Sequence, residues 1–246
     1  NPDGTQQVIY DERSPKYVDH LNKTFYFLED GRCFIVREET STGYMHLYLY
    51  GIGQGVLHPI TQGEWEVTDF VGLRGDKVYY ISTESSPLKR DLYRVGLDGK
   101  HKERLTPGDG YYSIYPSADL SYYICEGGDS SAPGRTDVFN AAGKRVRTLY
   151  DNAPLKEALV EAGLPVREFF TFTTERGDEL NGYMLKPLDF DPAKRYPVLL
   201  TQYSGPGSQQ VAEGWGPDWE DALVTHGYIV VCVCLLYTSP SPRDTR

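Results

Sequence analysis

Short apolar segments separated by turns rich in Gly, Asp and Pro make up residues 1–151. Segments such as Val78-Tyr-Tyr-Ile81 and Tyr122-Tyr-Ile-Cys125 have the composition and alternation of β-strands that are buried on at least one face. Within one stretch, the expected strands are 64–73, 77–82, 91–95 and 102–105. The turns between them are short enough for neighbouring strands to pair antiparallel. The pattern therefore predicts small antiparallel sheets of four strands.

The same pattern returns along this part of the chain. The segment His46-Leu-Tyr-Leu-Tyr50 recurs as Asp91-Leu-Tyr-Arg-Val95 and as Asp137-Val-Phe-Asn140, at intervals of 45 and 46 residues, and a turn with Gly follows each copy. Four antiparallel strands in a period of roughly 40–50 residues are typical of one blade of a β-propeller. Residues 1–151 are therefore predicted to form about three C-terminal blades of a propeller, the first of them incomplete.

The pattern changes after residue 151. Residues 152–164 are predicted to form a linker helix. Asn152 can cap its first turn, Pro154 fits that turn, and Gly163 ends it. Residues 165–233 are predicted to be the N-terminal part of an α/β-hydrolase domain, in which a hairpin leads into a βαβ unit of a parallel sheet. The expected elements are strands 167–174, 179–186, 195–203 and 228–233 and helix 218–226.

Residues 234–246 break the pattern. They follow the apolar strand at 228–233 without a turn signal, and Cys234 to Asp244 match the translation of a transposase sequencing adapter residue for residue. We therefore expect this tail to be a cloning or sequencing artefact and exclude it from the predicted fold. The opening Asn-Pro-Asp-Gly lacks a starting Met and is typical of a turn within a longer chain. The sequence is expected to be a fragment, incomplete at both ends.

The charge and the residue composition exclude several classes of binding partner. A net charge of −10 would repel nucleic-acid phosphates, so no nucleic-acid partner is expected. No apolar run approaches the roughly 20 residues of a membrane-spanning helix. The spacings C-x-x-C and H-E-x-x-H do not occur, so neither a metal nor a cofactor is predicted. Cys33, Cys125 and Cys232 lie in apolar segments and are expected to be small buried side chains.

Three segments carry a resemblance to a known family. They are Gly63-Glu-Trp-Glu-Val-Thr68, Arg195-Tyr-Pro-Val-Leu-Leu-Thr-Gln-Tyr-Ser-Gly-Pro-Gly-Ser-Gln209 and Gly227-Tyr-Ile-Val-Val-Cys-Val233. In this order they resemble the dipeptidyl-peptidase-IV-like branch of the prolyl oligopeptidase family of serine peptidases. The element Tyr-x-Gly-Pro-x-Ser-Gln is fairly specific for that branch. The resemblance implies an eight-bladed propeller stacked on an α/β-hydrolase domain, with the active site in the cavity between them.

The resemblance also implies an activity. Members of this branch take peptides with a free N-terminus and release dipeptides, usually with Pro or Ala second, through an acyl-enzyme. A periplasmic or secreted location and a homodimer of the complete protein are implied in the same way. Two alternatives stay open. The parent could be another peptidase of the family, tripeptidyl or acylaminoacyl, or a catalytically inactive propeller–hydrolase that binds peptides.

Acyl transfer from a peptide needs a nucleophile, a base, an orienting carboxylate and an oxyanion hole. The G-x-S-x-G elbow of α/β hydrolases does not occur in the sequence. The resemblance puts the Ser, Asp and His of the triad beyond residue 233, so the chain by itself is predicted to be inactive. Tyr203 matches the family tyrosine whose phenol donates a hydrogen bond to the oxyanion. The paired glutamates that hold the substrate's amino group have no counterpart, since Glu38-Glu39 lies in the wrong part of the repeat.

Overall fold

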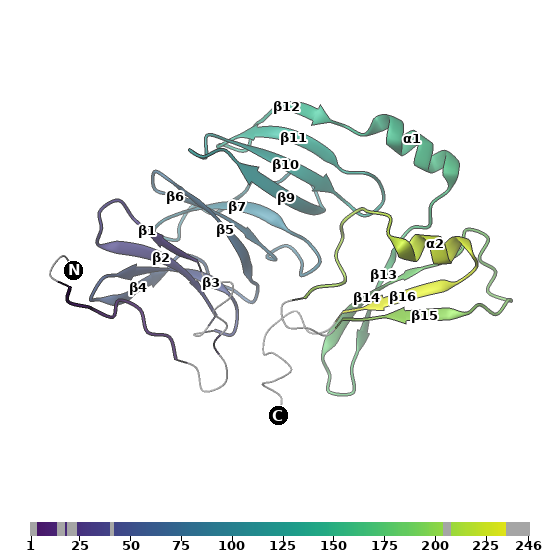
Figure 1. Ribbon diagram of the computed structural model, residues 1–246, viewed down its shortest axis with the longest axis horizontal. Helices are drawn as coiled ribbons and strands as arrows, with labels where there is room; N and C mark the ends of the chain where they lie inside the picture. The colour runs from purple at the N-terminus through teal and green to yellow at the C-terminus, as the bar shows by residue number, and fades with distance from the viewer. Residues whose placement is uncertain (1–3, 14–17, 19–23, 40–41, 204–207, 235–246) are drawn as a thin grey trace. The chain divides into compact units, whose positions relative to one another are not determined.

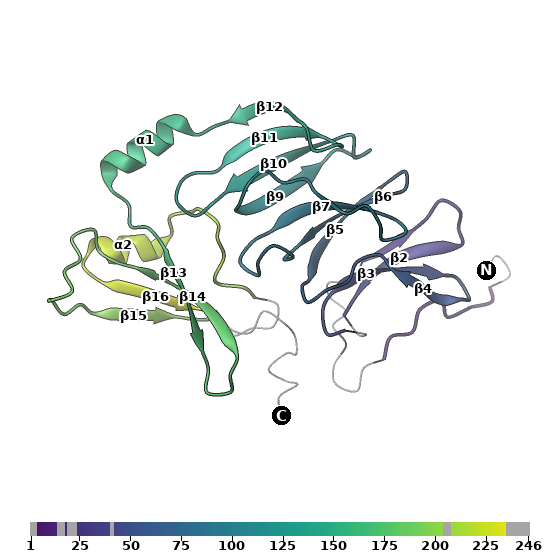
Figure 2. The ribbon, with the colours of Figure 1, turned by 180° about the vertical axis from the view of Figure 1, so that it is seen from behind.

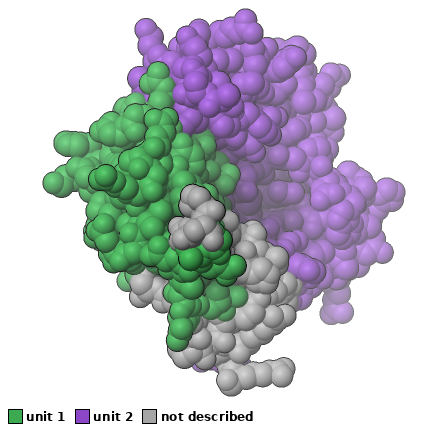
Figure 3. Space-filling model, turned by 60° about the vertical axis from the view of Figure 1, so that its left-hand side comes forward, with its two compact units in different colours: residues 1–84, 92–104, 238–246 green, residues 85–91, 105–237 purple. Residues whose placement is uncertain are grey.

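The computed structural model describes residues 4–13, 18, 24–39, 42–203 and 208–234. The chain divides into two compact units, which Figure 3 shows in different colours. The first takes residues from 1–84 and 92–104, and the second from 85–91 and 105–237. The domain boundaries expected from the sequence, near residues 151 and 164, stay predictions. Of the predicted artefact at 234–246, all but Cys234 lies outside the described residues.

The first unit contains two antiparallel sheets of four strands, each with its strands in chain order (Figure 1). One sheet consists of β1 (Phe25–Phe27), β2 (Cys33–Glu38), β3 (His46–Gly51) and β4 (Gly55–Pro59). The other consists of β5 (Val67–Arg74), β6 (Lys77–Ser82), β7 (Asp91–Gly96) and β8 (Glu103–Arg104). These sheets confirm the predicted blades. The first blade was wrongly expected to be incomplete, because β1, which pairs with β2, is too short to show an alternation.

Apolar side chains from both sheets of the first unit form one core. A ladder of rings runs through it, with Trp65 stacked on Tyr80 at 6.2 Å between ring centroids and Tyr80 on Tyr93 at 5.7 Å. Offset-stacked rings at this spacing contribute about 0.5–1.5 kcal/mol per pair beyond the area they bury. The other members are Ile35, Leu47, Leu49, Ile60, Val67, Val78 and Val95. The pattern of alternating apolar residues thus gives a continuous core between the two sheets.

A polar side chain opens the third strand of two blades and contacts a threonine 15 residues later. In the first blade, His46 Nδ1 lies 3.1 Å from Thr61 Oγ1. In the second, Thr106 Oγ1 donates to Asp91 Oδ1 at 2.6 Å. Both His46 and Asp91 are fully buried, where a polar group is stable only when it is hydrogen-bonded. Both blades therefore have a hydrogen bond between the start of the third strand and the chain just beyond the fourth strand. An imidazole makes this bond in the first blade and a carboxylate makes it in the second.

His46 is held as a neutral imidazole. Its Nε2 lies 2.9 Å from the carbonyl oxygen of Gly63, which can only accept, so Nε2 carries the proton. Thr61 Oγ1 accepts from the Leu47 amide at 3.0 Å, which leaves its own proton for Nδ1. Burial lowers the pKa of His46, and the contact with Gly63 and the charge of Glu84 oppose this only in part. A proton on Nδ1 would reverse the bond to Thr61, whose hydroxyl would then have to accept from the ring, and it would place a charge on a buried side chain.

The stability of the chain should therefore depend on pH through His46. Because burial lowers the folded-state pKa, the unfolded chain binds a proton first as the pH falls below about 6.5. The free energy of unfolding should decrease below that pH, by at most about 1.4 kcal/mol per pH unit for this group. Urea denaturation at a series of pH values measures the slope. His46→Gln should flatten it, whereas His101→Gln, at an exposed position, should not; an equal slope in all three proteins would contradict the assignment.

The second unit contains a third antiparallel sheet and a mixed sheet (Figures 1 and 2). The antiparallel sheet consists of β9 (Tyr111–Pro116), β10 (Tyr122–Gly128), β11 (Arg135–Asn140) and β12 (Arg145–Tyr150). The mixed sheet consists of β13 (Glu168–Thr173), β14 (Glu179–Leu185), β15 (Val198–Thr201) and β16 (Ile229–Val233), in the order β13-β14-β16-β15. The predicted hairpin is β13–β14, and the predicted βαβ unit is confirmed, since β15 and β16 are parallel neighbours.

Helix α1 (Ala153–Ala162) lies where the linker helix was expected, but its first turn is capped differently. Asn152 makes no side-chain cap; its Nδ2 donates instead to the Gly134 carbonyl at 2.6 Å, while Asp151 Oδ1 accepts from the Ala153 amide at 3.1 Å. The end is as predicted, because Gly163 adopts a left-handed φ of 65° and its amide donates to the Leu159 carbonyl. The cap prediction was wrong because a tertiary acceptor competed for Asn152.

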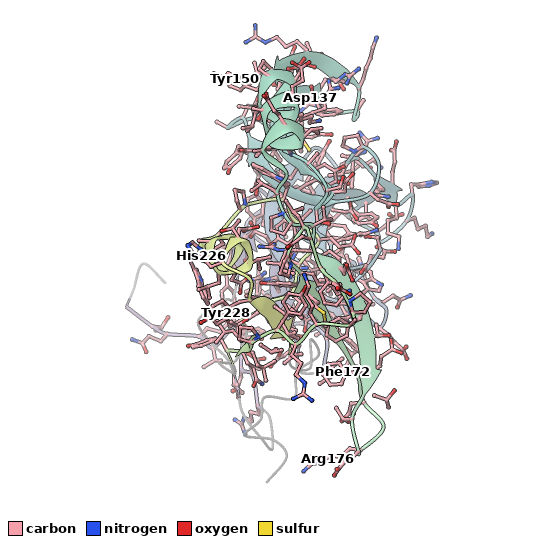
Figure 4. All side chains as sticks on the ribbon, turned by 90° about the vertical axis from the view of Figure 1, so that its right-hand side faces the viewer. Asp137, Tyr150, Phe172, Arg176, His226 and Tyr228 are labelled. Atoms are coloured by element: carbon pink, nitrogen blue, oxygen red, sulfur yellow. The ribbon has the colours of Figure 1, made fainter. Side chains whose placement is uncertain are left out.

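Helix α2 (Trp219–Thr225) covers one face of the mixed sheet. Asp218 and Asp221 form a reciprocal capping box at its start, and the chain then passes through His226 and Tyr228 into β16 (Figure 4). The core beneath α2 is formed by Leu88, Tyr183, Leu185, Val211, Val224, Val230, Cys232 and Cys234. On β15, Val198 and Leu200 are each 61% exposed. This alternation places the buried face of the sheet toward α2.

Candidate active site

Tyr203 lies two residues beyond the end of β15. Its side chain is 59% exposed, so the phenol is not enclosed in the apolar core. Because β15 and β16 are parallel, Tyr203 follows a carboxyl end of a parallel strand, where α/β folds present groups to ligands. The residues that follow, 204–207, lie outside the described part of the chain. The exposed position is compatible with donation of a hydrogen bond to a substrate, and the role of Tyr203 stays a prediction.

The strand that leads to Tyr203 is anchored by a buried carboxylate. Glu220, in the first turn of α2, is only 5% exposed. Its Oε1 accepts from Thr201 Oγ1 at 3.2 Å, and its Oε2 accepts from the Tyr183 hydroxyl at 2.5 Å. A buried carboxylate is stable only if its oxygens are hydrogen-bonded. Glu220 therefore ties α2 to the last residue of β15 and to β14 at once.

Burial is the main cause of the pKa shifts of Tyr183 and Cys232, which lie near Glu220. It raises the pKa of Tyr183 well above its ordinary value, and the hydrogen bond to Glu220 raises it further. Burial also raises the pKa of the Cys232 thiol, which faces Thr201 in the register of β15 and β16. Both side chains are therefore neutral at neutral pH. Tyr183 and Cys232 therefore act as fixed supports rather than as sources of protons.

Arg167 also contacts Tyr183, through the aromatic ring rather than through the hydroxyl that bonds Glu220. Its guanidinium lies 4.8 Å from the centroid of the Tyr183 ring, within range of a cation–π interaction. It also donates to the carbonyls of Gly214 and Gly216, at 3.4 and 3.2 Å. Sequence reasoning did not single out Arg167, Tyr183 or Glu220, since each has an ordinary place in a strand or in the first turn of a helix. Their roles depend on contacts between distant segments.

Glu38 is engaged inside its blade. Its Oε2 accepts from the Tyr10 hydroxyl at 2.6 Å and its Oε1 from the Tyr50 hydroxyl at 2.9 Å, and the side chain is buried. Both carboxylate oxygens are therefore used within the first unit. The expectation that Glu38-Glu39 does not serve as a pair for a substrate amino group stays a prediction.

A cavity of about 270 Å³ opens in the second unit. It is lined by α1, by the loop 130–133, and by the segments 163–167 and 214–217. Its two basic side chains are Lys156 and Arg167, and Tyr203 is not among its lining residues. Because Tyr203 does not line this cavity, the cavity is not assigned to the same site.

The described residues contain no group of three or more His, Cys, Asp or Glu side chains arranged for a metal ion. Cys125, Cys232 and Cys234 are buried free thiols, and Cys33 is partly buried, which departs a little from the expectation for Cys33. In the part of the chain that the structure describes, no helix has the length and apolar character needed to cross a membrane.

A family model and individual known proteins match this chain, and all of them are described as dipeptidyl peptidases or dipeptidyl-aminopeptidases. The sequence model of the family described as "Dipeptidyl peptidase IV (DPP IV) N-terminal region" matches residues 2–133. The chain is 31% identical over 217 residues to a probable dipeptidyl peptidase 4 of Aspergillus flavus, covering 87% of this chain and 28% of the relative. It is 37% identical over 213 residues to a probable dipeptidyl-aminopeptidase B of Aspergillus niger, covering 83% of this chain and 24% of the relative.

A solved structure shows the same likeness in the fold. The crystal structure of Porphyromonas gingivalis dipeptidyl peptidase 4 matches with a TM-score of 0.80 and 36% sequence identity, covering 90% of this chain and 31% of that one. The chain therefore spans about a quarter to a third of the length of the relatives it matches.

Proposed function

Because the chain belongs to the family described as the dipeptidyl peptidase IV N-terminal region, we propose that it is part of a serine exopeptidase that releases dipeptides from the free N-termini of peptides. The preferred second residue is Pro or Ala. The carrying observation is the likeness to a dipeptidyl peptidase 4 over 90% of the chain, across both the antiparallel sheets and the mixed sheet. The names of the similar proteins favour dipeptidyl over tripeptidyl or acylaminoacyl release.

The three antiparallel sheets are blades of a β-propeller, and the mixed sheet begins an α/β-hydrolase domain. In the proposed organisation, residues 1–151 are the blades, 152–164 the linker and 165–233 the start of the peptidase domain. Helix α1 supports this, because it separates β12, the last strand of the third blade, from the hairpin that opens the mixed sheet. Homodimer formation by the complete protein stays a prediction.

In the proposed mechanism, Tyr203 contributes to the oxyanion hole. When a nucleophile attacks the scissile carbonyl, negative charge develops on the carbonyl oxygen, and a donor fixed beforehand stabilises it without reorganisation. The exposed phenol supplies that donor. The bond between Thr201 and Glu220 limits the motion of the strand end two residues away. The chain thus supplies one part of the site, and the nucleophile, acid and base come from outside these 246 residues.

The test is the specificity of the complete protein that carries this chain. Gly-Pro-p-nitroanilide should be hydrolysed, while the N-acetylated form should not, because the exopeptidase requires a free amino group. Release of p-nitroaniline is followed by absorbance, with Ala-Ala-Pro-p-nitroanilide as the tripeptidyl control. Equal rates on the free and the acetylated substrate would contradict dipeptidyl release.

A further inference from the structure

We propose that the cavity of the second unit is a binding site for a small apolar carboxylate, a use that goes beyond the proposed function. The ligand is a single carboxylate on a short aromatic or branched apolar body, of the size of 3-phenylpropionate. The cavity has a volume of about 270 Å³, close to the lower end of the roughly 300–1,000 Å³ of small-molecule sites. Its lining residues all fall between 130 and 221, so it lies within one compact unit.

The walls of the cavity are largely apolar and come from segments that are far apart in sequence. Leu159 lies on α1, Leu164 and Pro165 follow that helix, Trp215 precedes α2, and Pro133 lies in the loop between β10 and β11. All five residues are buried or half-buried. An apolar group that enters the cavity is therefore removed from water on several sides, which favours its binding. The indole ring of Trp215 suits an aromatic body in particular.

Lys156 supplies the first positive charge of the cavity. It lies one turn before Leu159 on α1, lines the cavity and is half-buried. In the part of the chain that the structure describes, its ammonium group has neither a hydrogen bond nor an ion pair. A charged group next to apolar walls gains more from a counter-ion than one that is fully in water. Lys156 is therefore available to pair with an anion in the cavity.

Arg167 supplies the second positive charge, from a different segment. Its Nη1 and Nη2 donate to the carbonyls of Gly214 and Gly216, at 3.4 and 3.2 Å, and its guanidinium lies over the Tyr183 ring. These contacts hold the guanidinium at the cavity wall and use two of its five N–H donors. A planar cation that is already held in place loses little conformational freedom when it binds a further acceptor.

The acidic groups near the cavity are already compensated by other groups. Asp221, the acidic residue of the lining, accepts from the Asp218 amide at 2.7 Å and caps the start of α2. Asp129, just before the loop 130–133, accepts from the Ser131 amide at 2.8 Å. The pKa of Asp129 is lowered chiefly by its hydrogen bonds with Ser131 and only slightly by Lys156. The charge that lacks compensation is therefore positive, and the matching ligand is an anion.

The walls favour a carboxylate with an apolar body over a phosphate. Phosphate sites use several backbone amides in a loop or at the N-terminus of a helix. Here the N-terminus of α2 is already capped by Asp218 and Asp221, and what the cavity offers is two side-chain cations beside apolar residues. A singly charged group with an apolar body matches both parts of this lining, whereas a small, strongly hydrated phosphate matches only the cations.

The experiment titrates the complete protein with 3-(4-fluorophenyl)propionate and follows the ¹⁹F resonance of the ligand. The acid should bind saturably with a Kd of about 1 mM or tighter. The matching alcohol, 3-(4-fluorophenyl)propan-1-ol, has the same apolar body without the charge and should bind at least about tenfold more weakly, because charge-assisted hydrogen bonds are the stronger ones. Raising the ionic strength from about 0.02 to 0.2 M should weaken binding of the acid and leave that of the alcohol unchanged.

Variants of α1 connect this binding to the cavity. Lys156→Gln should weaken the acid about fivefold and hardly affect the alcohol. Its matched control is Lys144→Gln, at an exposed position of the same unit that does not line the cavity, which should change the Kd less than about twofold. Leu159→Asp puts a carboxylate in the apolar wall and should abolish binding. Because α1 has no fully buried residue, both α1 variants should unfold within about 3 °C of the parent.

Three results would overturn the proposal. The first is a complete protein that does not bind the acid saturably, which includes the case in which another part of that protein fills the cavity. The second is an equal Kd for the acid and the alcohol, since the cations would then contribute nothing. The third is an equal loss from Lys156→Gln and Lys144→Gln, which would show general attraction by surface charge. None of them bears on dipeptide release, which Gly-Pro-p-nitroanilide measures on the same samples.

Discussion

Replacing Tyr203 by Phe in the complete protein is expected to lower kcat for Gly-Pro-p-nitroanilide by about 10²–10³-fold, with KM changed less than about threefold. The variant removes one hydroxyl and keeps the ring. Loss of one oxyanion donor in a comparable peptidase costs about 2.7–4 kcal/mol of transition-state stabilisation. Since the oxygen of the ground-state carbonyl is only weakly charged, substrate binding should hardly change.

The control for this variant is Tyr228→Phe. Tyr228 is partly exposed, lies before β16 and belongs to the same unit, but it does not follow the carboxyl end of a parallel strand. We expect its kcat to stay within about twofold of the parent. If Tyr203→Phe kept full activity, or if Tyr228→Phe lost as much, the assignment of the oxyanion donor would be wrong.

The chain of 246 residues by itself is expected to show no hydrolysis of the same substrate above background. It contains no G-x-S-x-G elbow to carry a nucleophile. In a serine peptidase, removal of the nucleophile or the base costs about 10⁶-fold in kcat, and an oxyanion donor without an attacking group has no charge to stabilise. The measurement is the rate of p-nitroaniline release by the purified chain, compared with that of the complete protein at equal molarity.

Traces of a contaminating peptidase are the main source of error in this comparison. A fluorophosphonate probe, which labels an activated serine covalently, should label the complete protein and leave the isolated chain unlabelled. Stoichiometric labelling of the chain, with saturable release of p-nitroaniline, would show that it contains a nucleophile that the sequence does not reveal.

Much of the fold could be predicted because its signals are local or periodic. The alternation around Val78 and Tyr122 and the recurrence of the segment at His46 identified the blades, and the apolar segments at 195–203 and 228–233 identified the parallel pair. The failures have equally clear causes. Strand β1 has three residues, too few for a period of two to appear, and Asn152 found an acceptor in Gly134, 18 residues away, that no local rule includes.

Part of the candidate site could likewise be predicted from the sequence, and part could not. The motif that ends at Gln209 selected Tyr203 as a candidate, because it matches a pattern of residue types in a fixed order, and the role of Tyr203 stays a prediction. The contacts of the surrounding segments could not be predicted from the sequence, since Glu220 meets Tyr183 across 37 residues and Gln209 meets Arg90 across 119. A first-turn glutamate and an arginine in a loop have no periodicity that would predict such partners.

The sequence by itself determined the blades, the parallel pair and the family resemblance, and it selected Tyr203 as a candidate, because each depends on residues close together along the chain or on a repeat. Only the tertiary structure decided what holds the end of the strand that precedes that tyrosine. Burial makes an unpaired carboxylate costly, so Glu220 is stable only with the partners that folding brings to it. Those partners are fixed by the packing of distant segments, and no local pattern of residues records it.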